Sequence, residues 1–348
     1  MRSKKRGMKA LNRLLPAMVC AVALAMVVAC QSSASRRENS DEPPTGATRR
    51  GDSVRIEVGN GPCCLVVTEQ GIWVLNRRDR TLQLVDPKTN KATKSVDVGA
   101  VEMGLAGGHL FLADTDEGVL SLFDSAKRRQ RVIHGFGSRG GHAFHDGTLW
   151  LGSSTDGTLA RLRPPSTKIL ETITIPDVDG YAMMVLTDAS TLWTTTWDGE
   201  LLKIDLPSKR VVARMWPFPN PTDYVAFAVV DGSIFAVSGG SQSLVRLDPD
   251  TGQVLSQRSL DLTGGPGLSV QTDGSLWLIR GPDRIDELDP GTGQVLQTYH
   301  VPLTPGHEDE LHNGGGLATG FGSVWVGVWP DLQPNGTVIR LNRRPPSR

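Results

Sequence analysis

The chain has 348 residues, of which 39% are hydrophobic and 21% are charged, and its 37 basic residues balance 37 acidic residues. This composition suits a globular protein that can bury a sizeable core, and it excludes the strongly basic surface that attracts nucleic acids. We therefore expect no nucleic-acid partner.

The first 29 residues have the organisation of a targeting segment. Six Lys and Arg residues stand before position 14, and an apolar run follows at 14–29 that is short for a membrane span. The run ends in Val27-Val28-Ala29-Cys30, which resembles the lipobox of bacterial lipoproteins. The resemblance implies cleavage before Cys30, lipid attachment to its sulfur, and a location on the outer face of the cell membrane. An ordinary signal peptide and an uncleaved anchor are the alternatives.

Residues 31–52 contain no Val, Leu, Ile, Met or aromatic residue. Such a segment cannot bury enough apolar surface to offset the entropy of ordering, so we expect a flexible tether. The expected organisation is a signal peptide at 1–29, the lipidated cysteine and tether at 30–52, one domain at 53–343, and a tail at 344–348.

Cleavage would leave 31 basic against 37 acidic residues, a formal charge near −6. It would also remove Cys20, so the domain itself would keep only the adjacent Cys63 and Cys64. Adjacent cysteines cannot bridge distant segments, and the fold must be held by burial. Three states of the pair remain open: a vicinal disulfide, free thiols able to bind a soft metal, or two small apolar core residues.

An apolar residue followed by Trp or Phe recurs seven times, and the aromatic residues are spaced by 38, 39, 43, 42, 42 and 48 residues. A period of about 40 to 45 residues with short strands is typical of a β-propeller with one four-stranded blade per repeat. We therefore predict an all-β fold, a seven-bladed β-propeller. Because the ring occurs in every repeat, we expect it to pack between neighbouring blades rather than to bind a ligand. The doublets are Ile72-Trp73, Leu110-Phe111, Leu149-Trp150, Leu192-Trp193, Ile234-Phe235, Leu276-Trp277 and Val324-Trp325.

Turn signals separate the strands within the repeats. Asp-Gly between alternating apolar runs predicts a hairpin, because both residues tolerate positive φ. A proline follows the third strand in four repeats, and it ends the strand because it has no N–H to donate. The Asp-Gly pairs are at 146–147, 198–199, 231–232 and 273–274, and the prolines are at 87, 207, 249 and 290.

The last repeat provides only three strands, at 316–319, 324–328 and 338–341. Residues 54–58 alternate as a strand does and precede the first repeat. As the outer strand of the last blade, they would join the two ends of the domain and remove an open sheet edge.

The unit Gly-Ser-Leu-Trp at 274–277, followed by Leu-Asp-Pro-Gly-Thr-Gly at 288–293, resembles a seven-bladed superfamily. This superfamily includes YVTN-type surface proteins, NHL-like propellers and streptogramin B lyases. The resemblance covers essentially residues 53–343 and implies the fold. For the lyases it also implies opening of a cyclic depsipeptide by elimination, at a His/Glu cluster with a magnesium ion. No motif places those residues in this chain, and a fold does not by itself define an activity.

The segment 304–313, before the last repeat, is the richest in side chains that could carry chemistry. It holds two imidazoles and three carboxylates within six positions, which could bind a divalent metal or place a general base beside an acid. A solvated acidic loop is the alternative. The catalytic candidates in this segment are His307, Glu308, Glu310 and His312, and the metal candidates are His307 and His312.

Four further candidates stand where innermost strands are expected to begin. His142 could face the centre of the ring as a catalytic residue or be a structural histidine. Glu102 holds the corresponding position in the second repeat and is a candidate for ligand binding. Tyr181 and Tyr224 open the fourth and fifth repeats and could line a ligand site or pack in the core.

Two functions from different classes are consistent with these features. The first is a lipid-anchored binding or scaffold module of the cell envelope, with an unidentified protein, peptide or small molecule as ligand. The second is a hydrolase or lyase, lactonase-like or streptogramin-lyase-like, that depends on a divalent metal. No cofactor beyond that metal is implied.

Overall fold

The computed structural model describes residues 53–114, 119–124, 129–133, 141–153, 155–181, 183–186, 188–196, 198–218, 225–262, 267–271, 273–281, 283–303, 316–329 and 335–343. The expected signal peptide, Cys30, the tether and the C-terminal tail lie outside these residues. Within the described ranges, no helix has the length and apolar character needed to cross a membrane.

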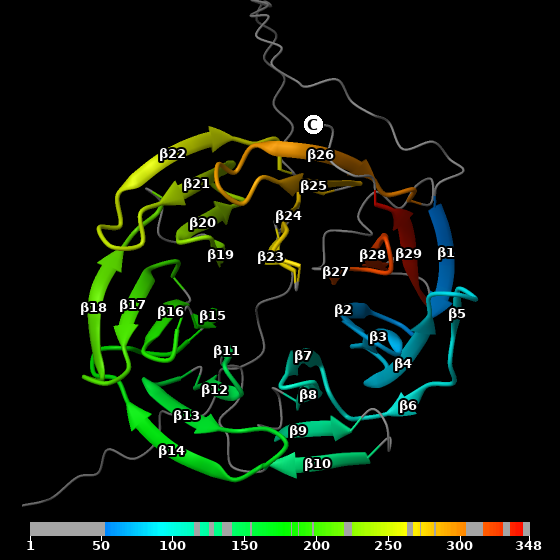
Figure 1. The fold of residues 1–348 in the computed structure, drawn as a ribbon, viewed down its shortest axis with the longest axis horizontal. Coiled ribbons are helices and arrows are strands. Elements are labelled where there is room, and N and C mark those ends of the chain that lie inside the picture. The colour runs from blue at the N-terminus through cyan, green and yellow to red at the C-terminus, as the bar shows by residue number, and fades with distance from the viewer. Residues whose placement is uncertain are drawn as a thin grey trace, which may run out of the picture. The chain divides into compact units, whose positions relative to one another are not determined.

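The described residues form seven β-sheets in a ring, one blade for each repeat of the sequence (Figure 1). Neighbouring strands within every blade are antiparallel, and in blades one to six the chain runs from the innermost strand to the outermost. The predicted seven-bladed β-propeller is confirmed.

The first three blades contain the strands β2 to β14. Blade one consists of β2 (Pro62–Thr68), β3 (Gly71–Asn76), β4 (Thr81–Asp86) and the short β5 (Lys91–Ala92) and β6 (Val96–Asp97), which both pair with β4. Blade two consists of β7 (Glu102–Ala106), β8 (His109–Asp114), β9 (Val119–Asp124) and β10 (Arg129–Ile133). Blade three consists of β11 (His142–His145), β12 (Thr148–Gly152), β13 (Thr158–Leu162) and β14 (Ile169–Thr174).

The remaining blades follow the same order. Blade four consists of β15 (Met183–Leu186), β16 (Thr191–Thr195), β17 (Leu201–Asp205) and β18 (Arg210–Met215). Blade five consists of β19 (Val225–Val230), β20 (Ser233–Ser238), β21 (Ser243–Leu247) and β22 (Val254–Ser259). Blade six consists of β23 (Gly267–Val270), β24 (Leu276–Ile279), β25 (Arg284–Leu288) and β26 (Val295–His300). Blade seven consists of β27 (Leu317–Gly320), β28 (Ser323–Val328), β29 (Gly336–Asn342) and β1 (Ser53–Val58).

The strand β1 closes the ring as its alternating sequence predicted. It pairs antiparallel with β29 along its whole length, from Ser53 opposite Leu341 to Val58 opposite Gly336. Figure 1 shows the N-terminal strand beside the C-terminal one. The first strand of the domain therefore completes the last blade and covers its outer edge.

The seam between blades seven and one is very tightly packed. A Cβ added to Gly327 would lie 2.2 Å from the carbonyl oxygen of Pro62, and one added to Gly316 would lie 2.7 Å from the carbonyl oxygen of Cys63. Glycine is required at both positions because the facing backbone occupies the space of a side chain.

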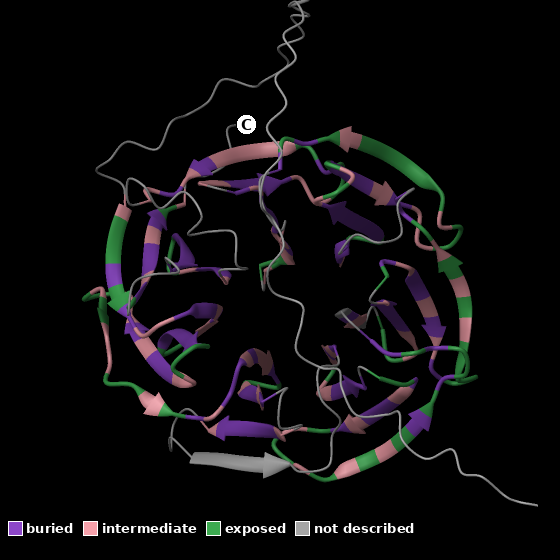
Figure 2. Cartoon of the chain, turned by 180° about the vertical axis from the view of Figure 1, so that it is seen from behind, coloured by how far each residue is buried: buried purple, intermediate pink, exposed green. Residues whose placement is uncertain are grey.

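The seven repeated aromatic residues occupy equivalent places between the blades. Each belongs to a separate hydrophobic cluster that joins two neighbouring blades, and none is more than 5% exposed. Trp73, for example, packs with Met103 of blade two, and Trp325 packs with Ile72 of blade one. Figure 2 shows the buried residues concentrated in the inner and middle strands, whereas the outer strands β14, β18, β22 and β26 carry mainly exposed and intermediate residues. The predicted packing role of the aromatic repeat is confirmed.

The predicted turns form for local reasons. Asp146 and Gly147 have φ values of 44° and 71°, which define a type I′ hairpin turn. In the outer turn of blade five, the carboxylate of Asp248 accepts hydrogen bonds from the backbone N–H and the hydroxyl of Thr251, at 2.7 and 2.9 Å. Asp289 and Thr292 repeat this pair in blade six. The recurring Asp-Pro-x-Thr-Gly sequence is therefore a turn motif.

A basic residue lies across from the aromatic ring in several blades. Arg161, Lys203 and Arg340 are the cross-strand partners of Trp150, Trp193 and Trp325, and each cation lies 5.0 to 5.7 Å from the ring centroid. The cations also reach the next blade: Lys203 Nζ donates to the carbonyl of Pro249 at 3.1 Å, and Arg340 Nη1 donates to that of Pro87 at 2.7 Å. These contacts stabilise neighbouring blades against each other.

Candidate functional site at the upper face of the ring

The innermost strands β2, β7, β11, β15, β19, β23 and β27 all begin on one face of the ring, because every blade repeats the same strand order. We call this the upper face and the opposite one the lower face. Residues at the beginning of innermost strands surround the centre of a propeller, where ligands commonly bind. The described candidates Cys63, Cys64, Glu102 and His142 all stand there.

A β-bulge places both thiols of blade one on the same side of β2. Successive side chains of a regular strand point to opposite faces. Here the pairing of β2 with β3 slips between Pro62 and Cys64, so that Cys63 has no partner in the ladder. Both cysteines consequently pack in the cluster that joins blades one and two.

The two cysteines are free thiols in direct contact. Their sulfur atoms lie 2.7 Å apart, and Cys63 Sγ lies 3.6 Å from the carbonyl oxygen of Val101. Cys63 is buried and Cys64 is half-buried. The hydrogen bond with Cys64, followed by burial, raises the pKa of the Cys63 thiol well above its ordinary value. Both side chains pack in the cluster between blades one and two, and no bridge joins the two sulfur atoms in this structure.

Glu102 opens blade two beside the thiol pair. It is half-buried at the first position of β7, immediately after Val101, whose carbonyl the Cys63 thiol contacts. Its negative charge contributes, less than the Cys64 hydrogen bond and burial, to the raised pKa of the Cys63 thiol. Cys63, Cys64 and Glu102 therefore meet at the seam between blades one and two.

His142 opens blade three at the next seam. Its ring lies edge-on against Phe111 of blade two, with 4.3 Å between the ring centroids. A Cβ at Gly104 would lie 2.3 Å from the Phe111 ring and 3.3 Å from His142 Nε2, so the missing side chain makes room for both rings. Burial lowers the pKa of the His142 imidazole to about 4, and the ring is neutral near pH 7. These contacts favour the structural histidine among the two roles considered.

Tyr181 has the second of its two expected roles, core packing. It is fully buried in the cluster between blades three and four, and its hydroxyl donates to the carbonyl of Gly157 at 2.9 Å. The only O–H donor of this side chain is therefore engaged within the core. Tyr181 is therefore not placed to line a ligand site, and the ligand-binding prediction for it is not supported.

The acidic and imidazole-rich segment before blade seven lies outside the described residues, with its candidates His307, Glu308, Glu310 and His312. Tyr224 lies outside them as well. Gly316, which is described, follows this segment in the sequence and packs against the backbone of Cys63 and Cys64. Among the residues that the structure describes, no group of three or more His, Cys, Asp or Glu side chains could hold a metal ion.

Trp329 is a residue of the upper face that the sequence pattern did not reveal. It follows β28, is 5% exposed, and belongs to the same hydrophobic cluster as Cys63 and Met103. Its indole Nε1 is buried and has no hydrogen-bond partner among the described residues. The repeat pattern identifies Trp325, which occupies the packing position. Trp329 stands four residues later, outside this pattern, and nothing in the sequence distinguishes it from another core residue.

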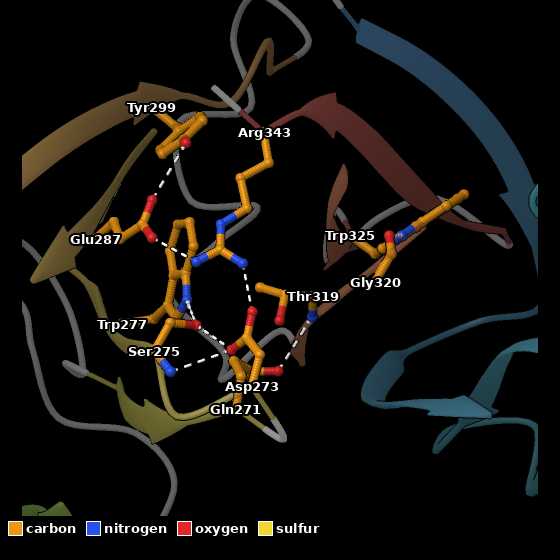
Figure 3. A network of polar contacts seen from close by, with 10 residues as sticks. All are labelled: Gln271, Asp273, Ser275, Trp277, Glu287, Tyr299, Thr319, Gly320, Trp325 and Arg343. Carbon is orange, nitrogen blue, oxygen red and sulfur yellow. Dashed lines mark hydrogen bonds and ion pairs between the residues drawn. The ribbon is translucent and has the colours of Figure 1, made fainter. Parts of the chain in front are cut away.

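The polar network at the lower face belongs to the fold rather than to this site. Figure 3 shows Arg343 between the carboxylates of Glu287 and Asp273 and beside Trp277. The hydroxyl of Ser275 accepts a hydrogen bond from Trp277 Nε1 at 2.7 Å and donates one to Asp273 at 2.6 Å. Each of these polar side chains has a hydrogen-bond or ion-pair partner within the network.

Comparison with solved structures places the chain in a class, the seven-bladed β-propellers. A streptogramin B lyase superposes with a TM-score of 0.62 at 15% identity, over 83% of this chain and 98% of that one. The virginiamycin B lyase of Staphylococcus aureus gives a TM-score of 0.61 at 13% identity, over 84% of this chain and all of that one.

The likeness extends to propellers of unrelated context. A chain of the mitotic checkpoint complex gives a TM-score of 0.63 at 12% identity, over 92% of this chain and 99% of that one. The sequence matches no family model and no curated protein. At these identities the comparisons show the fold, and the expected resemblance to streptogramin-lyase-like propellers holds at that level.

Proposed function

We propose that this protein is a lipid-anchored binding module of the bacterial cell envelope, and that its ligand binds at the upper face of the propeller. The lipobox at Val27–Cys30 and the apolar-free tether at 31–52 support the anchored location. The upper face supports the binding role through the side chains that it gathers.

The observation that carries the proposal is the buried indole N–H of Trp329, which has no hydrogen-bond partner among the described residues. Buried hydrogen-bond donors in folded proteins almost always have a partner, and a missing one costs about 1–3 kcal/mol. Trp329 lies in the cluster that also contains Cys63 and Met103, at the start of the innermost strands. A ligand with a hydrogen-bond acceptor would satisfy this donor.

Substitution of Trp329 tests the binding role. The full chain would be screened by thermal shift against a panel of short peptides, lactones and cyclic depsipeptides. Trp329→Phe keeps the aromatic packing but removes the N–H, and it is expected to weaken binding of any hit by about tenfold, the value of one hydrogen bond. Trp216→Phe is the control, because Trp216 is 48% exposed. Equal affinities of the Trp329→Phe and parent chains would exclude the proposed site.

The membrane anchor is tested separately. Cys30→Ser is expected to move the chain from the membrane fraction to the soluble fraction and to abolish the mass increase of the N-terminal peptide. Cys20→Ser is the control, since Cys20 lies within the segment that cleavage would remove. A parent chain without lipid on Cys30 would contradict the anchor and leave the binding site to its own test.

The second candidate function is a metal-dependent lyase or hydrolase. One observation favours it: Gly316, three positions after the His- and acid-rich segment, packs at the upper face against Cys63 and Cys64. Metal analysis of the purified chain, together with turnover of lactones and cyclic depsipeptides, tests it. His312→Ala would abolish both the bound metal and turnover, whereas His109→Ala, at the lower face, would change neither. A metal-free, inactive parent chain would exclude this function.

A further inference from the structure

Cys63 and Cys64 of blade one form the one pair of adjacent thiols among the described residues. The two sulfur atoms lie 2.7 Å apart on one side of β2, although neighbours in a strand normally point to opposite sides. The bulge between Pro62 and Cys64 produces this arrangement, and bulges commonly redirect side chains at functional sites.

The backbone at the bulge can accommodate a covalent bridge. Cys63 has no partner in the ladder between β2 and β3, so a change of its backbone angles breaks no pairing of blade one. Two adjacent cysteines form a small ring when bridged, and such rings require local backbone adjustment. A paired strand residue would oppose that adjustment, whereas the unpaired Cys63 permits it.

The exposures of the two thiols give them different roles. Cys64 is half-buried and can meet a reagent from solvent, whereas Cys63 is buried behind it. Cys63 touches only its neighbour and the carbonyl oxygen of Val101 among its hydrogen-bond contacts in the described chain. This arrangement suits an attacking thiol and a resolving thiol of one exchange reaction.

We propose that Cys63 and Cys64 form a redox-active vicinal dithiol, a covalent modification site that small disulfide oxidants close to a disulfide and dithiols reopen. The Cys64 thiolate attacks one sulfur of the oxidant, whose S–S bond breaks and releases the first thiolate. Cys63 then loses its proton and attacks Cys64 Sγ, which forms the vicinal bridge and releases the second thiolate. Two electrons pass to the oxidant, which takes up the two protons and ends as two thiols.

A disulfide between Cys63 and Cys64 would affect the packing at the seam between blades seven and one, where the ring closes. The carbonyl oxygen of Cys63 and the Cα of Cys64 lie 2.7 and 2.9 Å from the place of a Cβ on Gly316, directly before β27. A backbone shift at the bulge therefore alters the packing of blade seven against blade one. The proposal does not depend on the identity of the ligand, because the state of the thiols is read directly.

Mass analysis of the full chain tests the modification. Trypsin releases residues 56–77 as one peptide, which contains Cys63 and Cys64 and no other cysteine. After equilibration with oxidised and reduced glutathione, acid quenching and alkylation, the oxidised peptide is expected to be two hydrogen atoms lighter and unalkylated. Dithiothreitol should restore two alkylation sites. Two alkyl groups at every glutathione ratio would overturn the proposal, and so would a bridge from Cys63 or Cys64 to another cysteine.

Single substitutions identify the roles of the two thiols. Cys63→Ser is expected to trap glutathione on Cys64, because the resolving thiol is missing. Cys64→Ser should take up glutathione far more slowly, since the remaining thiol is buried. Equal glutathione uptake by both variants would overturn the assigned order of attack.

Hydrogen exchange of β27 in the oxidised and reduced chains tests the effect on the seam between blades seven and one, with β14 as the internal control. Identical exchange of β27 in both states would overturn the coupling to the seam.

Discussion

In blade six, the guanidinium of Arg343 lies against the Trp277 ring and takes the place of the basic residue that other blades have across from their aromatic ring. In blades three, four and seven, a basic residue stands across from the aromatic ring, whereas Trp277 of blade six faces Glu287. Arg343, the residue directly after β29 of blade seven, supplies the charge. It lies 5.5 Å from the Trp277 ring centroid and donates to the buried Glu287 carboxylate at 2.5 Å (Figure 3).

Loss of Arg343 should therefore destabilise the propeller. Arg343→Gln leaves Glu287, whose side chain is 4% exposed, with only the Tyr299 hydroxyl at 3.4 Å as a hydrogen-bond partner among the described residues. An uncompensated buried charge is costly, and we expect a loss of about 3 kcal/mol in the free energy of unfolding. Denaturant titration measures it. Arg210→Gln, at an exposed position of β18, should change little, and an equal effect of both variants would contradict the role of Arg343.

Deletion of 53–60 should destabilise the whole ring. The deletion removes β1 and exposes the edge of β29, along which all six residues of β1 are paired. We expect a melting temperature lowered by many degrees with a broadened transition, measured by calorimetry. A truncated chain that melts at the parent temperature would show that the closure contributes nothing to stability.

Gly327→Ala should disrupt the seam between blades seven and one. The new Cβ would lie 2.2 Å from the Pro62 carbonyl oxygen, and backbone cannot move aside as a flexible side chain can. Overpacking of this kind costs about 1–3 kcal/mol or more. Gly291→Ala is the control, because the nearest atom to its Cβ is Asp289 Oδ1 at 3.4 Å in an exposed turn. Equal unfolding free energies for both variants would contradict the tight seam.

His142 should make the stability of the protein dependent on pH below neutrality. Burial lowers its pKa to about 4 in the folded state from an ordinary value of 6.5, so the unfolded chain binds the proton more strongly. Its contribution is complete above pH 6.5 and is lost as the pH falls towards 4, by at most about 3 kcal/mol. Denaturant titration between pH 4 and 7 measures it. His142→Gln should flatten this part of the profile, and an unchanged slope would show that another group titrates.

The repeat made the fold predictable because propeller blades use the same local solutions many times. Trp73 and its equivalents, the Asp146-Gly147 hairpin and the Asp289-Thr292 turn are all set by residues close in sequence. Even the closure by β1 could be predicted, since a blade with three strands requires a fourth. These features depend on alternation and turn chemistry, which are visible in the letters.

The arrangement at the upper face depended on contacts between blades. Nothing in the sequence indicates that β2 bulges at Cys63 or that His142 packs on Phe111 beside Gly104. Nor does it indicate that the Trp329 indole is buried without a hydrogen-bond partner in the described part of the chain. Tyr181 also packs in the core instead of lining a ligand site, because its hydroxyl donates a hydrogen bond to the carbonyl of Gly157 in the preceding blade. Such outcomes depend on how closely neighbouring strands and blades approach one another, and no single repeat unit shows that approach in its sequence.

The sequence by itself determined the number of blades, their turns and the closing strand. The repeats can be counted, the turns depend on residues close in sequence, and a last repeat with three strands requires a fourth. The tertiary structure alone decided which side chains share a seam: the thiols with the start of blade two, and Arg343 with a carboxylate 56 positions earlier in the chain. The physical reason is that contacts between blades depend on distance in space. The period of the repeat carries no information about contacts that differ from one blade to the next.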